Sequence, residues 1–289
     1  MMSTRVTVAP TRKLPSGSEI PVIGFGVYLI PISETVQAVK GALEVGYRLI
    51  DSASCYANEQ QCGEGIMKFL AENPEYKRSD IFYTSKVWES DYGYEGAKKA
   101  VDVSLAEVKD LEYIDLYLIH STAGGKKTRL DTYKALQEAV EAGKIRNIGV
   151  SNWGVKHLQE LLDWPELKVM PVVNQIEYSP WLQHGDIVSF CNKHNIIIEA
   201  FSPLTVGQRL ADPSVVSLAE KYKKSPAQIL LRWSVQTGAI PLPKTVRAQR
   251  MKENIDIFDF ELSKDDLKNL GDPSSYYVTV PEWDPTKRE

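Results

Sequence analysis

Short apolar segments alternate with longer stretches of helical periodicity along nearly the whole chain. Eight of these segments are rich in Val and Ile and have the length of strands, and each is followed by an expected helix. Strands that are apolar throughout are buried on both faces, as in a parallel sheet covered by helices. The expected strands are Val22–Val27, Tyr47–Ile50, Ile81–Val87, Ile114–Ile119, Ile145–Val150, Val169–Asn174, Ile196–Ala200 and Ala239–Leu242.

Eight strand–helix units close into a barrel more naturally than they stay open. The predicted fold is therefore of the α/β class, a (β/α)8 TIM barrel that forms a single domain over residues 1–289. Such a barrel uses about 250 residues, and no repeat or linker divides this chain. The expected helices are 33–45, 59–71, 95–109, 129–142, 154–163, 183–194, 213–236 (two pieces that meet near Ser225-Pro226), 247–256 and 263–270.

The two ends of the chain add smaller elements to this barrel. Residues 12–21 predict a β-hairpin that precedes the barrel, with Ser16 and Gly17 at its turn. The C-terminal tail is irregular, is expected to lie over the rim of the active site, and carries the aromatic residues Tyr276, Tyr277 and Trp283. Aromatic side chains in such a segment either pack onto the barrel or line the mouth of a ligand site, and both interpretations stay open.

Charge and cysteine content narrow the possible functions. Lys and Arg number 34 and Asp and Glu 38, and a net charge of −4 gives no general attraction to nucleic acid or anionic membranes. No apolar run reaches the roughly 18 residues of a membrane span, and no signal peptide is expected. Three cysteines without metal-ligand spacing favour a reducing, cytoplasmic location and no bound metal. No apolar stripe demands a partner, so we expect a monomer.

Residues that can take part in chemistry follow nearly every expected strand. Asp51 ends the second strand, Lys86 lies in the third, and His120 follows the fourth. Tyr56 comes after Asp51, across a turn of small polar residues. The ends of these strands meet at the C-terminal rim of a barrel, where barrel enzymes carry out their reactions. One such residue is more often simply solvated, but four on one rim predict a catalytic set.

Together these four side chains could deliver a proton to an oxygen that gains negative charge. The phenol of Tyr56 has an ordinary pKa of about 10, and a neighbouring ammonium of Lys86 is expected to lower it toward neutrality. Asp51 would hold Lys86 charged, and His120 would hydrogen-bond the substrate oxygen. A carbonyl oxygen gains such charge when its carbon receives hydride. Because none of the four residues can supply hydride, we predict a nicotinamide cofactor.

The cofactor site is predicted at the last strand, because the usual dinucleotide fingerprint is absent. The G-F-G at 24–26 and the G-E-G at 63–65 both lack its third glycine. Barrels often bind phosphate after the seventh and eighth strands, and here basic residues open a helix whose amides favour anions. Since arginine suits a 2′-phosphate, we predict NADPH/NADP+ in preference to NADH. The basic residues are Lys244, Arg247, Arg250 and Lys252, of which Lys252 fits a solvated face equally well.

The motifs of this chain resemble those of the aldo-keto reductases along essentially its whole length. They are G-Y-R-L-I-D-S-A-x-x-Y around Asp51, T-S-K-V-W at Lys86, L-Y-L-I-H at His120, G-V-S-N-W, V-V-N-Q-I-E-Y-S-P, and L-P-K-T with Arg250 and Asn254. The chain is most similar to compact microbial and fungal members such as aldehyde, xylose, glycerol and diketogluconate reductases. The resemblance implies that the four rim residues are the catalytic set, and that NADPH lies extended across the barrel.

The resemblance also implies how each part of the cofactor is held. Ser151, Asn152 and Gln175 would bind the nicotinamide carboxamide, and Phe201 would stack on its ring. Ser202 and Leu204 would lie near the pyrophosphate. The other implied contacts are Lys244, Thr245 and Arg250 at the 2′-phosphate, with Glu253 and Asn254 at the adenine.

The expected substrate is a small molecule with a carbonyl group. Tyr28, Trp88 and the tail aromatics would line an apolar pocket. Ser121 follows His120 where many family members have a bulkier residue, so a pocket wall is expected to be thinner here. Such a pocket fixes few hydroxyl groups, and we expect broad specificity for aldoses, short aldehydes, dicarbonyls and keto acids.

Two other functions fit the same scaffold. Lys86 could form a Schiff base, as in aldolases, but that role needs a lowered pKa, whereas an Asp51 partner raises it. Alternatively, the protein could bind NADP(H) as a sensor without turnover, because a fold alone does not fix a function. The four-residue catalytic set argues against the sensor, and a turnover assay would decide.

Overall fold

Eight parallel strands form one sheet in which each strand, from β3 to β10, pairs with the next in the chain. The computed structural model describes residues 8–287. Backbone amides of Gly24 and Gly26 donate to the carbonyl oxygens of Pro241 and Pro243 at 3.0 and 3.1 Å, and these bonds close the sheet into the predicted TIM barrel. The strands are β3 (Phe25–Gly26), β4 (Leu49–Asp51), β5 (Phe82–Val87), β6 (Ile114–Ile119), β7 (Ile145–Ser151), β8 (Val173–Glu177), β9 (Ile197–Phe201) and β10 (Ile240–Pro241).

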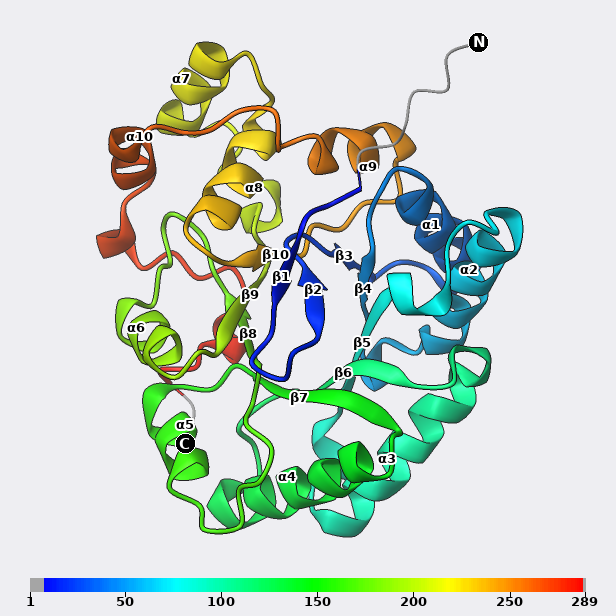
Figure 1. Ribbon diagram of the computed structural model, residues 1–289. Coiled ribbons are helices and arrows are strands. Elements are labelled where there is room, and N and C mark those ends of the chain that lie inside the picture. Colours follow the sequence, from blue (N-terminus) through cyan, green and yellow to red (C-terminus); the bar gives the residue numbers. More distant parts are fainter. Residues whose placement is uncertain (1–7, 288–289) are drawn as a thin grey trace.

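Helices surround the strands, which lie at the centre of the view in Figure 1. The predicted break in the long helix near Ser225 is confirmed, because that hydroxyl accepts a hydrogen bond from the amide of Gln228 and Pro226 opens α8. The helices are α1 (Ile32–Glu44), α2 (Glu59–Glu72), α3 (Tyr94–Glu107), α4 (Gly125–Glu141), α5 (Val155–Leu162), α6 (Gly185–Lys193), α7 (Pro213–Tyr222), α8 (Pro226–Gln236), α9 (Ala248–Ile255) and α10 (Lys264–Asn269).

Several expected elements are displaced in the structure. The sixth strand, expected at 169–174, runs from Val173 to Glu177. Pro171 has no amide hydrogen to donate to a ladder, and Met170 is exposed, so pairing begins only after them. Helix α4 begins at Gly125, four residues before the expected start, because its first turn is polar and carries no apolar periodicity. The first and last strands are shorter than expected, and residues 1–7 and 288–289 lie outside the described chain.

The predicted hairpin lies across one end of the barrel (Figure 1). Strand β1 (Thr11–Lys13) pairs antiparallel with β2 (Glu19–Pro21). At the turn, Gly17 has a left-handed φ of +91°, which favours glycine, and its amide donates to the carbonyl of Leu14 at 2.9 Å. Leu14 and Ile20 of the hairpin are buried against the barrel interior. The hairpin therefore plugs this end of the barrel with apolar side chains.

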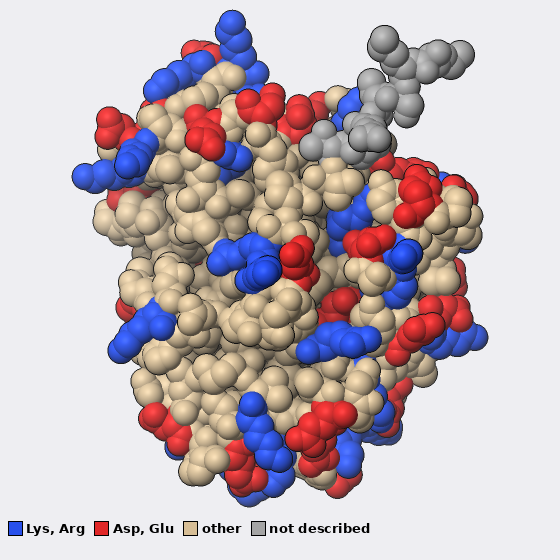
Figure 2. Space-filling model, in the orientation of Figure 1, with Lys and Arg blue, Asp and Glu red and all other residues tan. Residues whose placement is uncertain are grey.

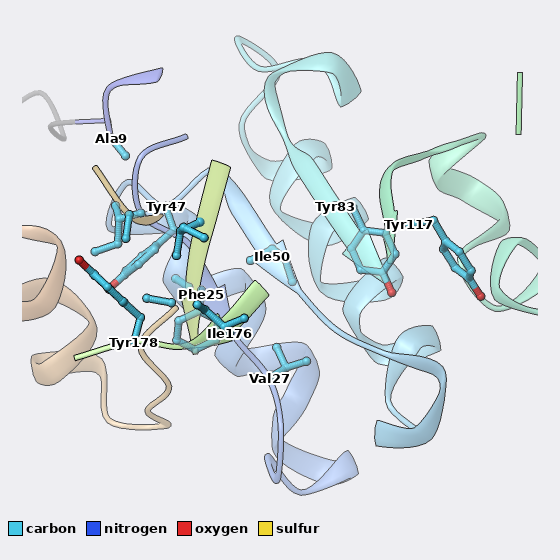
Figure 3. Packing of buried hydrophobic residues seen from close by; sticks show 14 of the residues in the cluster. Ala9, Phe25, Val27, Tyr47, Ile50, Tyr83, Tyr117, Ile176 and Tyr178 are labelled. Atoms are coloured by element: carbon cyan, nitrogen blue, oxygen red, sulfur yellow. The ribbon is translucent and has the colours of Figure 1, made fainter. Parts of the chain in front are cut away.

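Alternation along the strands separates the core into two layers. Side chains that point into the barrel form a small apolar cluster with the hairpin, whereas their neighbours point outward into a larger cluster shared with the helices. Figure 3 shows part of the outer layer, from Phe25 and Tyr47 at one side to Tyr83 and Tyr117 at the other. The inner cluster is Leu14, Ile20, Leu49, Phe82, Leu116, Leu118, Val172, Val173, Ile197, Ile240 and Leu242.

The face that carries the hairpin mixes charges of both signs. Figure 2 shows acidic and basic side chains interspersed with uncharged surface, without a broad region of one sign. This surface has no feature that would attract a polyanion. Within residues 8–287, no helix combines the length and the apolar content that crossing a membrane requires.

Candidate active site

A buried ion pair lies in the barrel interior at the end away from the hairpin. The alternation that points Leu49 inward on β4 also points Asp51 inward, and Phe82 and Lys86 are related in the same way on β5. The ammonium of Lys86 donates to both carboxylate oxygens of Asp51 at 2.9 Å and to the carbonyl oxygen of Ser52 at 2.7 Å. Lys86 is 0% exposed, so its charge has no access to bulk water.

The charge state of Lys86 follows from two opposing effects. Burial acts to lower the pKa of Lys86, whereas the neighbouring Asp51 and Tyr56 act to raise it. The raising effects together are larger, so the pKa of Lys86 lies above its ordinary value. Lys86 therefore stays an ammonium at physiological pH. An amine that keeps its proton is a poor nucleophile and a good electrostatic partner for a nearby anion.

Tyr56 stands beside this ion pair. It ends a short 3-10 helix, Ser54–Tyr56, that follows directly after β4. Its hydroxyl lies 3.4 Å from the Lys86 nitrogen, which also sits 4.9 Å from the centre of the phenol ring. A phenol beside a fixed ammonium can donate its proton and leave a phenolate that the ammonium stabilises.

The expectation that Lys86 lowers the pKa of Tyr56 to near neutrality is wrong for the protein alone. Lys86 does act in that direction, but burial has the larger effect and raises the pKa of Tyr56 above its ordinary value. The phenol consequently holds its proton at neutral pH, and it is poised as a proton donor rather than as a base.

His120 and Tyr28 flank the Tyr56 ring, and two tryptophans contact His120. The His120 ring lies 5.9 Å from the Tyr56 ring, and the Tyr28 ring lies 4.9 Å from Tyr56 on another side. Trp88 meets the edge of His120 at 5.1 Å, and Trp283 of the tail stacks on His120 at 5.4 Å. One of the two open interpretations of the tail is thereby decided for Trp283, because its indole lies against the candidate site.

The tail is held in place by a carboxylate at the end of β8. Glu177, only 2% exposed, accepts hydrogen bonds from the backbone amides of Thr279 and Val280 at 2.8 and 3.1 Å. The hydroxyl of Thr279 also donates to it, at 2.5 Å. These bonds fix the chain three residues before Trp283. Glu177 therefore determines how the tail covers the rim, and sequence reasoning missed this role.

The residues predicted to bind the carboxamide lie together at the end of β7 and on the neighbouring strand β8, and they are joined by hydrogen bonds. The hydroxyl of Ser151 donates to the carbonyl of Gln175 at 2.8 Å, and the amide nitrogen of Asn152 donates to that hydroxyl and to the carbonyl of His120, both at 3.1 Å. The side-chain oxygen of Asn152 is buried and has no hydrogen-bond partner among residues 8–287. An unpaired acceptor at this place fits the amide group of a nicotinamide.

The loop after β9 and the start of α9 form the remainder of the predicted cofactor surface. Ser202, Thr205 and Val206 have left-handed φ angles of 47°, 50° and 53°, and such strain gathers at ligand-binding loops. Lys244 and Arg250 are exposed, and neither forms an ion pair with a residue in the described part of the chain. The other predicted contacts in this region are Phe201, Leu204 and Glu253, which are half-buried, and Thr245 and Asn254, which are buried.

One serine has a setting that the sequence did not predict, and two inward-pointing carboxyl groups were not predicted at all. Ser121, predicted to line the pocket, is fully buried, and its hydroxyl donates to Glu89. Glu177 and Glu199 were not singled out in advance. The available signal was a lone acidic residue in an apolar strand, spaced by two residues from Gln175 and Phe201 respectively.

The barrel holds an Asp–Lys pair, a phenol and an imidazole at its C-terminal end. Comparisons with known proteins identify it as an oxidoreductase. The model of the Aldo/keto reductase family matches residues 23–272. An uncharacterized oxidoreductase of Saccharomyces cerevisiae is 46% identical over 275 residues, which is 95% of this chain and 97% of the relative. The glyoxal reductase of Bacillus subtilis is 43% identical, over 90% of this chain and 91% of that enzyme.

Solved structures lead to the same family. The Bombyx mori aldo-keto reductase in complex with NADP superposes with a TM-score of 0.87 at 33% identity, over 96% of this chain and 97% of that one. The chain belongs to the aldo/keto reductase family.

Proposed function

We propose that this protein reduces aldehydes and ketones to alcohols with NADPH, and that Tyr56 is the general acid. The observation that carries the proposal is the position of the Tyr56 hydroxyl, 3.4 Å from an ammonium that Asp51 and Ser52 hold in place. When bound, NADPH would supply the hydride that reaches the carbonyl carbon. Tyr56 then gives its proton to the carbonyl oxygen, and Lys86 stabilises the phenolate that remains. His120 hydrogen-bonds the same oxygen and orients it.

The raised pKa of Tyr56 fits the direction of reduction. A proton donor must enter the reaction protonated, as a phenol with an ordinary or a raised pKa is at neutral pH. The proton leaves only as negative charge builds on the substrate oxygen, when the adjacent ammonium of Lys86 offsets the charge left behind. Asp51 keeps Lys86 charged without itself reaching the substrate.

The residues present fit an NADPH molecule at both of its ends. Ser151, Asn152 and Gln175 would hold the carboxamide, which is supported by the buried, unpaired oxygen of Asn152. At the other end, Lys244 and Arg250 would bind the 2′-phosphate, because both are exposed cations without an acidic partner in residues 8–287. The NADP named for the Bombyx mori relative also supports the proposal.

Phe201, Ser202 and Leu204 would lie along the nicotinamide and pyrophosphate, and Thr245, Glu253 and Asn254 beside the 2′-phosphate and adenine. The aromatic side chains of Tyr28, Trp88 and Trp283 lie against the rings of Tyr56 or His120. This favours a broad range of small carbonyl substrates over one polyhydroxylated sugar. The cytoplasmic location and the monomeric state stay predictions from the sequence.

The Schiff-base alternative for Lys86 is disfavoured by the raised pKa of that amine and by its hydrogen bonds to Asp51. Failure of borohydride to trap a keto substrate on the protein would exclude it. The sensor alternative predicts NADPH binding without turnover, and the assay below distinguishes it directly.

Replacing Tyr56→Phe tests the proposed acid. Oxidation of NADPH with a panel of short aldehydes, dicarbonyls, aldoses and keto acids should fall by about 10²–10⁴-fold, because the proton donor is lost. NADPH binding, followed by quenching of tryptophan fluorescence, should stay as in the wild type. Tyr28→Phe is the matched control, since it removes a phenol hydroxyl from the same aromatic group without a contact to Lys86. Equal loss in both variants, or loss of NADPH binding, would give Tyr56 a structural role.

The cofactor assignment has its own test. Lys244→Met and Arg250→Ala should each weaken NADPH binding by about tenfold to a hundredfold while changing NADH little, since only NADPH carries the 2′-phosphate. Lys252→Ala, on the same helix as Arg250, controls for a general loss of positive charge. Equal weakening of NADPH and NADH would remove the phosphate contact from these two residues.

A further inference from the structure

A second carboxyl group is buried beside the catalytic ion pair. Glu199 lies on β9 and is 0% exposed. In the sheet it is in register with Gln175 on β8 and with Ile240 on β10. Its side chain accepts a hydrogen bond from Gln175, and the proposed reaction gives it no task. A carboxyl group that is completely buried is costly unless the structure uses it.

Glu199 reaches the catalytic pair through one amide. The side-chain nitrogen of Gln175 donates to Glu199 at 2.8 Å and to Asp51 at 2.8 Å. Ionised Asp51 can only accept, so the nitrogen of this amide must face it, and the Glu199 oxygen at the same nitrogen is then also an acceptor. Two hydrogen bonds use both N–H groups. The amide oxygen of Gln175 is thereby left as an acceptor for the carboxamide of the nicotinamide, which we propose to lie beside Ser151, Asn152 and Gln175.

The charges around Glu199 favour its neutral form. The titratable groups that face it are Asp51 from β4 and Lys86 from β5, whereas Gln175 and Ile240 do not titrate. With Glu199 protonated, this buried layer is neutral, and with Glu199 ionised it carries one net negative charge. The second oxygen of Glu199 has no hydrogen-bond partner among residues 8–287. Burial and Asp51 together raise the pKa of Glu199 to about 8.

We propose that Glu199 is a positioning residue which, as a neutral acid, fixes the Gln175 amide with its nitrogen on Asp51 and its oxygen turned toward the nicotinamide carboxamide. This rests on the proposed function for the identity of the ligand, but not for the proton on Glu199. When Glu199 ionises, its negative charge adds to that of Asp51 around Lys86. Tyr56 then receives less help from Lys86, and carbonyl reduction slows.

The first arm of the test needs no cofactor. Between the ordinary pKa of a glutamate, about 4.3, and the folded value near 8, the folded protein binds one more proton than the unfolded chain. Stability from Glu199 is therefore complete at low pH and is lost as pH rises through this window. The urea midpoint of the wild type, relative to that of Glu199→Gln, should fall from pH 5 to pH 8. Parallel pH dependences would overturn the neutral acid.

The second arm follows the ligand and the reaction. Glu199→Met removes the acceptor and should weaken NADPH binding by about threefold to tenfold. Glu199→Gln keeps an acceptor for Gln175 and should restore binding. It should also remove the decline of kcat/KM above pH 8 that we expect for the wild type. Glu59→Gln, which removes a buried carboxyl that accepts hydrogen bonds from Ser85 and Ser104, should keep that decline.

The outcomes separate the two proposals. If Glu199→Met binds NADPH as tightly as the wild type, or the alkaline decline persists in Glu199→Gln, the positioning role is wrong. If the wild type neither binds NADPH nor reduces carbonyls, the proposed function fails, and the urea arm still decides the protonation of Glu199. If Glu199→Met does not fold, Glu199→Gln carries both the urea comparison and the pH profile.

Discussion

The two ends of the barrel interior are built from the same strands, but one is mostly apolar and the other is charged. At the hairpin end, Leu49, Phe82 and Leu116 pack with the hairpin in an apolar cluster, and the buried Asn147 accepts a hydrogen bond from Ser16 of the hairpin turn at 2.5 Å. Two to four residues further along β4 and β5, the same inward face presents Asp51 and Lys86. Leu49, Asp51 and Lys86 are all buried, so the difference between these residues of the two ends is one of chemistry and not of burial.

This difference separates the sources of stability and of activity. Burying apolar groups contributes about 25 cal/mol for each Å² removed from water, with nothing left to pair. A buried ion pair contributes little net stability, because desolvation offsets most of the attraction between the charges. We therefore expect the Asp51–Lys86 pair to serve the chemistry of Tyr56, and the apolar cluster at the hairpin end to supply more of the stability of the fold. Each of the following predictions tests this separation.

The largest effect is expected at the catalytic end. Lys86→Met should lower the free energy of unfolding by about 3–5 kcal/mol, because Asp51 is left buried without its counter-charge. Carbonyl reduction should also be lost. The double variant Asp51→Leu with Lys86→Met should recover most of the stability but none of the activity. Urea unfolding measures the first and NADPH oxidation the second. A double variant as unstable as the single one would show that the pair does stabilise the fold.

A somewhat smaller loss is expected at the hairpin end. Leu116→Ala should cost about 2–5 kcal/mol through the cavity it leaves, with kcat/KM within about twofold of the wild type. Leu116→Met nearly preserves the side-chain volume and should cost less than about 1.5 kcal/mol. A large fall in kcat/KM for Leu116→Ala at a temperature where it is fully folded would show that the two ends are coupled.

The smallest effect is expected at the tail. Glu177→Ala removes the acceptor for Thr279 and Val280, a loss of roughly 1 kcal/mol, and should raise KM for aldehydes about fivefold. NADPH affinity should not change, because these bonds position Trp283 and not the cofactor residues. Thr279→Val, which removes only the hydroxyl contact, should raise KM less. Unchanged KM in both variants would mean that the tail plays no part in binding the substrate.

The sequence predicted the barrel and the proximity of Asp51 to Lys86, because both follow from patterns of hydrophobicity along the strands. Continuous apolar strands between amphipathic helices indicate a parallel barrel, and a polar residue that interrupts such a strand stands out, as Asp51 and Lys86 do. The sixth strand was misplaced because Val169, Met170 and Val172 look like a strand until Pro171 is weighed. Its hydrogen bonds, and not its hydrophobicity, decide where pairing starts.

Other features depend on distances that a sequence does not contain. The net pKa of Tyr56 is the difference between desolvation and attraction to Lys86, and only the folded arrangement fixes which is larger. The stacking of Trp283 on His120 joins residues from distant parts of the chain. Glu199 is recognisable in the sequence as one acidic residue in an apolar strand. Its hydrogen bond with Gln175, from which we infer a role, is known only from the folded structure.

The hydrogen bonds that join Gly24 and Gly26 to Pro241 and Pro243 have a consequence for synthesis. They link the first barrel strand to the last, so a nascent chain cannot complete the barrel until β10 has left the ribosome. Until then the inner faces of the earlier strands stay open to solvent and to other chains. Because chains grow at about 5–20 residues per second, this exposed stage lasts for many seconds, and it is the period in which we expect the protein to depend most on chaperones.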